Sequence, residues 1–152
     1  MKKRIWNKVI SILTAILLVV GIVPNTTITA LAADGDTVYV GGVALTGSTG
    51  SPVYATTGTN GNVNSGGNES SYNIKWDGST LTLHNATIKE SVSTDTNTYV
   101  AGAAIGVFNK SGNAELTISL VGTNTIANVG KGIFVLASSA STGSSNLTIQ
   151  GD

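Results

Sequence analysis

The 152-residue chain contains no cysteine, one histidine and two prolines, and only 5% of its residues are aromatic and 11% charged. The lack of cysteine excludes stabilisation by disulfides and also excludes a lipid anchor, which would be attached to a cysteine. Because His84 is the only histidine, a zinc site or a nucleophilic triad lacks its parts. His84 is therefore expected to cap the end of a strand rather than to catalyse a reaction.

Cationic side chains are scarce once the first residues are set aside. Four of the eight basic residues lie within the first eight positions, and residues 33–152 carry four lysines against eight acids, a net charge of −4. A phosphate backbone is bound by clustered lysine and arginine, so a nucleic-acid partner is excluded.

The acidic residues form no catalytic or metal-binding pattern. They are scattered mainly over expected loops and turns, whereas glycoside cleavage needs two converging carboxylates. Asp34 and Asp36 have the spacing of a calcium loop, but Val38 occupies the position of a third ligand, so a solvated N-terminus is favoured. We expect no catalytic residue, no metal or other cofactor, and no enzyme activity in this chain.

Residues 1–32 are predicted to be a signal peptide. Basic residues precede the apolar run Val9–Val23, and Ala30-Leu31-Ala32 places small residues at the cleavage site. The run is shorter than the roughly 20 residues that a membrane-spanning helix needs, and an uncleaved anchor is the less favoured alternative. The prediction is an extracellular or cell-envelope protein that meets the membrane only during export.

Residues 33–71 are predicted to hold one short β-type run and a long exposed loop. Val38–Leu45 is the β-type run, interrupted at Gly41-Gly42 by a bulge or a tight turn. Thr46–Ser71 is almost entirely Gly, Ser, Thr and Asn, a composition typical of loops.

Tyr72–Ile88 is predicted to form two strands joined at Asp77-Gly78, a dipeptide common in tight turns. Alternation places Tyr72, Ile74 and Trp76 on one face of the first strand.

Residues 72–152 contain short motifs that recur about 30 residues apart, the mark of a repeat architecture. The motif L-T-[IL] occurs at 81–83, 116–118 and 147–149. A second motif, a small residue followed by I-x-V, occurs at 104–107 and 132–135. A third motif, which begins with Asn and ends in T-I, occurs at 85–88 and 124–126. The motifs also keep the same order, which indicates one structural unit per period.

Three short strands per period, separated by corners at Gly or Asn, predict a parallel β-coil in which each period forms one turn, or rung. A single rung cannot bury its apolar residues, so each must stack on the next. Asn85 and Asn124 are expected at corners, linking rungs rather than binding a ligand. The alternative is an antiparallel β-sandwich or barrel. A helical protein is excluded because the segments after residue 32 lack an apolar stripe of helical period that is free of Gly.

At these residues the chain resembles secreted Gram-positive bacterial proteins with right-handed parallel β-helix repeats of the pectin-lyase-like type. The resembling parts are VYVGGVALTG, YNIKWDGSTLTLHNATI and the later L-T-I, N-T-I and G-I-x-V motifs. Several such proteins are described as carbohydrate-binding-domain proteins. The resemblance implies a secreted or cell-surface module, structural or adhesive, with a polysaccharide or cell-wall glycan as its partner.

The resembling proteins continue for more rungs, whereas this sequence stops at Asp152, directly after an L-T-I strand. An open last rung would leave unpaired backbone groups and apolar edges. One expectation is a truncated piece of a longer protein, and the missing rungs could then hold the groove of a polysaccharide lyase or glycoside hydrolase. The other is self-association through the open rung.

Aromatic side chains are the candidates for sugar binding, because exposed rings stack on the faces of sugars. The candidates are Trp76, Tyr72, Tyr54 and Tyr99. For Trp76, packing is favoured over ligand contact because it alternates with Ile74 in the manner of core residues.

Overall fold

The structure, a computed structural model, describes residues 37–110, 112–138 and 143–151. The predicted signal peptide and the Asp34/Asp36 pair lie outside these residues. The described chain folds into twelve strands without a helix, which confirms the all-β prediction. Accordingly, none of the described residues belongs to a helix long and apolar enough to span a bilayer.

The largest sheet has six strands in the order β12-β9-β6-β5-β3-β4. Its strands are β3 (Val53–Thr57), β4 (Val63–Ser65), β5 (Ile74–Trp76), β6 (Thr80–His84), β9 (Ala114–Val121) and β12 (Ser145–Gly151). The strands β12, β9 and β6 run parallel to one another, whereas the pairs β6–β5, β5–β3 and β3–β4 are antiparallel.

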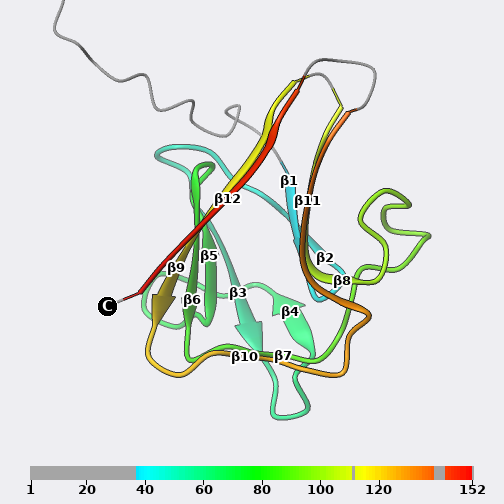
Figure 1. Cartoon of the computed structure of the whole chain (residues 1–152). Helices are drawn as coiled ribbons and strands as arrows, with labels where there is room; N and C mark the ends of the chain where they lie inside the picture. The colour runs from blue at the N-terminus through cyan, green and yellow to red at the C-terminus, as the bar shows by residue number, and fades with distance from the viewer. Residues whose placement is uncertain (1–36, 111, 139–142, 152) are drawn as a thin grey trace, which may run out of the picture.

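Two smaller sheets complete the fold. The four-stranded sheet has the order β11-β8-β1-β2, with β1 (Thr37–Val40), β2 (Val43–Thr46), β8 (Ala103–Asn109) and β11 (Lys131–Ala137). The third sheet is the parallel pair β7 (Thr87–Ile88) and β10 (Thr125–Ile126). Figure 1 shows the three sheets as three sides around a common interior, and buried residues from all three form one core cluster.

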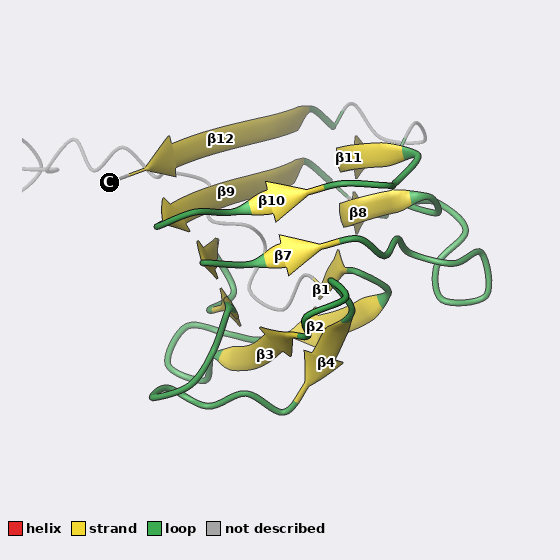
Figure 2. Cartoon of the chain, turned by 90° about the horizontal axis from the view of Figure 1, so that it is seen from below, coloured by secondary structure: helices red, strands yellow, loops and turns green. Residues whose placement is uncertain are grey.

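The parallel pairs follow the order of the chain. Strands β6, β7 and β8 pair with β9, β10 and β11 respectively, and β9 then pairs with β12. We call β6, β7 and β8 the first layer and β9, β10 and β11 the second, and β12 begins a third. Figure 2 shows β12 over β9, β10 over β7 and β11 over β8. The L-T-I motifs at 116–118 and 147–149 are in register, with Leu116 opposite Leu147, and so are the two I-x-V motifs, with Ile105 opposite Ile133.

Apolar side chains at matching register positions form columns that run through the layers. In the six-stranded sheet, Trp76 pairs with Leu81, Leu81 with Ile118, and Ile118 with Ile149. The first three are buried, while the residues beside them on the strands, such as Thr82 and Thr117, are partly exposed. The alternation of a half-buried strand therefore continues from layer to layer.

One motif lies in a different register from the one its sequence suggests. Leu81 and Leu83 pair with Ile118 and Leu120, so the first L-T-L motif stacks on I-S-L, two residues later than the second L-T-I motif. A shift of two residues keeps every side chain on its own face, so the sequence pattern cannot distinguish the two registers.

The prediction of one long loop over Thr46–Ser71 is wrong, because this segment contains β3 and β4. Strand β3 pairs with β5 on one side and β4 on the other, and Ala55 and Val63 are buried. The loop-like composition concealed these strands, because they contain few apolar residues.

The two predicted turns are present. Gly41-Gly42 joins the antiparallel strands β1 and β2, and both glycines have positive φ, which resolves the earlier choice in favour of a tight turn. At the turn between β5 and β6, Gly78 has a φ of +90°, and a Cβ there would lie 2.8 Å from the Ser48 Cα. Glycine is therefore required at this close approach.

Asp77 organises the same turn through its Oδ1 atom, which accepts hydrogen bonds from the amides of Ser79 at 3.0 Å and Thr80 at 2.8 Å. Partial burial alone would raise the pKa of Asp77. The two amides, the Ser79 hydroxyl and the charge of Lys75 outweigh that effect, so the pKa lies below its ordinary value.

We expect Leu81→Ala to lower the free energy of unfolding by about 2–5 kcal/mol, because it empties a fully buried position between layers. The neighbouring Thr82→Ala should cost less than about 1 kcal/mol. Denaturant unfolding of both variants measures the difference. An equal loss of unfolding free energy in the two variants would contradict the conclusion that Leu81 faces the core while Thr82 faces outward.

The turn also predicts a pH dependence of stability. Because the pKa of Asp77 is lowered by folding, its contribution is present above the unfolded-state pKa of about 3.9 and is lost as the pH falls through the lower folded-state value. Asp77→Asn should therefore be less stable than the parent at pH 7, and the gap should narrow below pH 4 or so. The free energies of unfolding of the two proteins are measured across this pH range. A difference between them that does not change with pH would contradict this role of Asp77.

Candidate functional site

Trp76 is not a ligand residue. Its side chain is 0% exposed and lies in the core cluster, with Ile74 beside it on β5 and Leu81 opposite on β6. A ring without exposed surface cannot stack on a sugar, so the prediction of Trp76 as a sugar-binding candidate is wrong. The alternation with Ile74 was the sequence signal for this outcome.

Tyr54 and Tyr72, by contrast, come together on the six-stranded sheet. Their ring centroids lie 5.4 Å apart at an interplanar angle of 55°, and Tyr72 also lies 5.9 Å from the His84 ring at 57°. All three side chains are partly exposed. We call Tyr54, Tyr72 and His84 the aromatic row.

The backbone explains how the row forms. Tyr54 precedes the buried Ala55 on β3, and His84 follows the buried Leu83 at the end of β6, so both side chains face away from the core. Sequence alternation put Tyr72 on the face of Trp76. In the structure Tyr72 precedes the first residue of β5, and its ring contacts Tyr54 and His84 instead.

Asn73 fixes the backbone next to Tyr72. Its Oδ1 accepts a hydrogen bond from the Thr57 amide at 2.9 Å, and its Nδ2 donates to the His84 carbonyl at 3.1 Å. Asn73 therefore ties the end of β3 to the end of β6, the strands that carry the other two rings. This bracket could not be predicted from the sequence, because it depends on a pairing of β3 that the loop-like composition concealed.

The row offers partly exposed rings beside polar groups. Tyr54 is paired across the sheet with Lys75, and Lys75 with Thr82, so an ammonium and a hydroxyl lie on the strands next to the rings. Such a surface suits a neutral hydroxylated ligand, which needs apolar ring contacts and a few hydrogen bonds.

Tyr99 lies apart from this row, in the turn before β8 of the four-stranded sheet. It is 56% exposed and stacks on Phe108 of β8, with centroids 3.9 Å apart and an interplanar angle of 13°. The pair borders a shallow pocket of about 260 Å³ that Lys110 and Leu136 also line. Sequence reasoning missed Phe108, although its place between the buried Val107 and Asn109 predicts an outward side chain.

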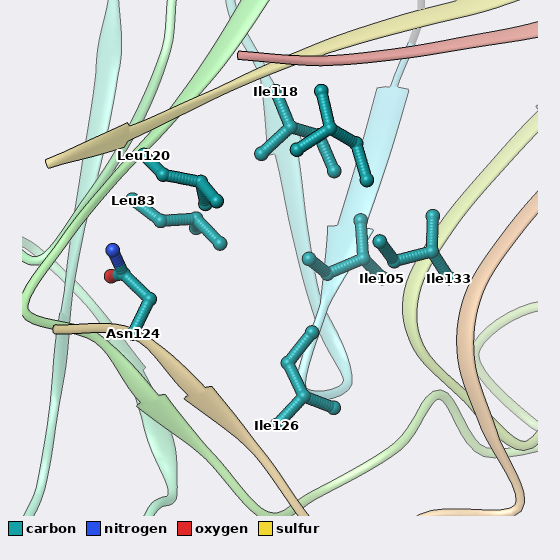
Figure 3. Close-up of a pocket in the computed structure, with 8 residues that line it drawn as sticks. Leu83, Ile105, Ile118, Leu120, Asn124, Ile126 and Ile133 are labelled. Atoms are coloured by element: carbon teal, nitrogen blue, oxygen red, sulfur yellow. The ribbon is translucent and has the colours of Figure 1, made fainter. Parts of the chain in front are cut away.

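A second pocket, of about 210 Å³, opens at the end of the layers. Side chains from all three sheets line it, among them Ile126, Ile133 and Ile149, together with Asn124. Figure 3 shows the labelled side chains pointing into a shared space. Leu147 and Ile149 on β12 are 45% and 52% exposed. We call this feature the end pocket.

Asn85 and Asn124 lie at the corners between the sheets, as predicted. The Asn124 Oδ1 accepts from the Ala86 amide at 2.8 Å, and the Asn85 Oδ1 accepts from the Thr123 amide at 2.9 Å, so each side chain bonds to the backbone of the other layer. Asn85 has a φ of +50°, and a Cβ on Gly122 would clash with its amide. These residues are structural brackets between layers.

Within the described residues, no cluster of three or more His, Cys, Asp or Glu side chains could hold a metal ion. Comparisons with protein-family models, curated proteins and solved structures find no match to the chain.

We expect Asn124→Ala to lower the free energy of unfolding by about 1–3 kcal/mol, because the partly buried Ala86 amide loses its acceptor. Asn146→Ala is the control, since Asn146 is exposed on β12 and its hydrogen bonds are 3.4 Å or longer. It should cost less than about 1 kcal/mol. Denaturant unfolding measures both losses. If Asn146→Ala loses as much unfolding free energy as Asn124→Ala, the role of Asn124 in holding the layers together is contradicted.

Proposed function

We propose that the protein is a secreted or cell-surface, non-enzymatic module that folds as a right-handed parallel β-helix and binds polysaccharide. The signal-peptide pattern of residues 1–32 and the resemblance to secreted β-helix repeat proteins support the location. The observation that carries the binding proposal is the aromatic row.

Two features support the β-helix. Parallel pairs recur on three sides of the core in chain order, so the chain passes around the same interior in each layer. Asn85 and Asn124 bracket successive corners. Parallel crossovers in one sheet are right-handed in about 98% of cases, which is the reason for the proposed hand.

The aromatic row supports a polysaccharide as the ligand. Its rings lie on an outward face of a sheet, so a long polymer can reach them without entering a closed cavity. Tyr54, Tyr72 and His84 are held by strands and by the Asn73 bracket. Rigid rings lose little conformational entropy on binding, which favours weak but specific contacts repeated along a chain of sugars.

The test is retention of the protein, expressed from its complete sequence, on Gram-positive cell walls and on plant cell-wall polysaccharides. Tyr54→Leu and Tyr72→Leu should each weaken binding by about 3- to 10-fold, the effect of one lost ring contact. Tyr54→Phe should retain binding because the ring remains.

Tyr99→Leu is the matched control, because it removes an exposed tyrosine that lies away from the aromatic row and stacks on Phe108 of β8. The proposal predicts no change in retention for this variant. A folded parent protein that none of these polysaccharides retains would refute the binding proposal and leave a structural module. Depolymerisation of the polysaccharide would instead indicate the lyase or hydrolase alternative.

A further inference from the structure

One row of outward residues crosses five strands of the six-stranded sheet and begins at the aromatic row. Each residue of this row pairs with the next across the sheet, in the order Tyr54, Lys75, Thr82, Ser119 and Gln150. Their side chains lie on the side of the sheet that faces away from the core, and all five are at least partly exposed. We call these five residues the polar track.

The polar groups of the track are available to a ligand. Within the described residues, the hydroxyls of Thr82 and Ser119 have no hydrogen-bond partner, and each can donate one hydrogen bond and accept others. Gln150, exposed on the next strand, adds an amide that both donates and accepts. Successive strands therefore each present a group that is complementary to the hydroxyls of a sugar.

The spacing of the strands determines the shape of ligand that fits the track. Neighbouring strands lie about 4.8 Å apart, close to the length of one sugar unit in an extended chain. From Tyr54 to Gln150 the track covers four such spacings, or about 19 Å. A chain that runs across the strands therefore brings one sugar to each strand if it is extended, as β-1,4-linked glycans are. A coiled or branched chain leaves the row.

The charges of the track favour a neutral ligand over an anionic one. The track contains one lysine and no acid, and the charge of Lys75 is partly balanced by Asp77, whose pKa it helps to lower. Residues 33–152 carry a net charge of −4, which repels a polyanion. A single balanced lysine does not offset that repulsion along a chain of acidic sugars.

We propose that the ligand of the aromatic row is a neutral, unbranched β-1,4-linked glycan that lies across the strands along the polar track. One end of the glycan stacks on Tyr54 and Tyr72, and the sugars that follow form hydrogen bonds with Thr82, Ser119 and Gln150. This proposal rests on the proposed function. It adds the class of the ligand, its direction on the sheet and three residues that contact it.

The length of the site is tested by NMR titration of the protein, expressed from its complete sequence, with β-1,4-linked oligomers of glucose and of N-acetylglucosamine. A tetramer of the sugar that binds should have a dissociation constant at least about 10-fold below that of the dimer, because it forms hydrogen bonds beyond the rings. Polygalacturonate, an anionic chain, should not bind. Equal dissociation constants for dimer and tetramer, or binding of the anionic chain alone, would overturn the proposal.

The same substitution at two threonines locates the track. Thr82 lies on it, whereas Thr117 lies on the same face of the adjacent strand β9, two residues and roughly 6.6 Å from Ser119. Thr82→Val should raise the dissociation constant of the tetramer about 3- to 10-fold, through the loss of one hydrogen bond. Thr117→Val removes an equally unbonded hydroxyl and should leave that constant unchanged. Circular dichroism verifies that both variants are folded.

Ser119→Ala tests the direction of the ligand. Ser119 lies three strand spacings, or about 14 Å, from Tyr54, so a dimer bound at the rings does not reach it. The variant should weaken binding of the tetramer about 3- to 10-fold and leave binding of the dimer unchanged. A loss of the same size for both oligomers, or for neither, would contradict a glycan that runs across the strands.

The outcomes distinguish failure of the track from failure of the proposed function. Retention on polysaccharide that Tyr54→Leu weakens, while Thr82→Val and Ser119→Ala have no effect, would overturn the track and leave the proposed function intact. A folded protein that no polysaccharide retains would refute the proposed function and the track together.

Discussion

Each layer of this protein needs a neighbouring layer in register. The strands are short and each contributes only about two inward apolar residues, so no layer has a core of its own. Trp76, Leu81 and Ile118 are buried because they stack in one column. The Asn brackets at the corners hold the layers at the spacing that the columns require. Burial, corner geometry and sheet pairing therefore depend on one another.

The two ends of the stack meet this requirement differently. At the first layer, the parallel order gives way to antiparallel strands: β5 and β3 extend one sheet and β1 and β2 extend another. Trp76 is buried at this transition, where it pairs with Leu81. At the other end, within the described residues, β12 pairs with β9 alone and the end pocket is open. The aromatic row lies at the antiparallel end, on strands β3 and β6 and directly before β5.

The sequence predicted what is local or repeated. Alternation located the half-buried strands β5 and β6, Asp77-Gly78 located their turn, and Asn85 and Asn124 were recognised as corners. It did not predict β3 and β4, because their composition is typical of loops and few of their residues are apolar. It assigned the first L-T-L motif to a register two residues off, because such a shift changes no face. The sequence did not predict the aromatic row either. Tyr72 lies two residues before β5 begins, so the strand alternation that placed it on the face of Trp76 does not apply to it.

The central claim is that successive layers stack in parallel and in register, and methyl NOE spectroscopy tests it most directly. Leu81, Ile118 and Ile149 occupy one column, with Ile118 in the middle. The structure predicts cross-peaks from the Ile118 methyls to both Leu81 and Ile149, and from Ile105 to Ile133. Cross-peaks that instead connect β9 to β12 in antiparallel order, with Leu116 near Ile149 and Ile118 near Leu147, would contradict the layered arrangement.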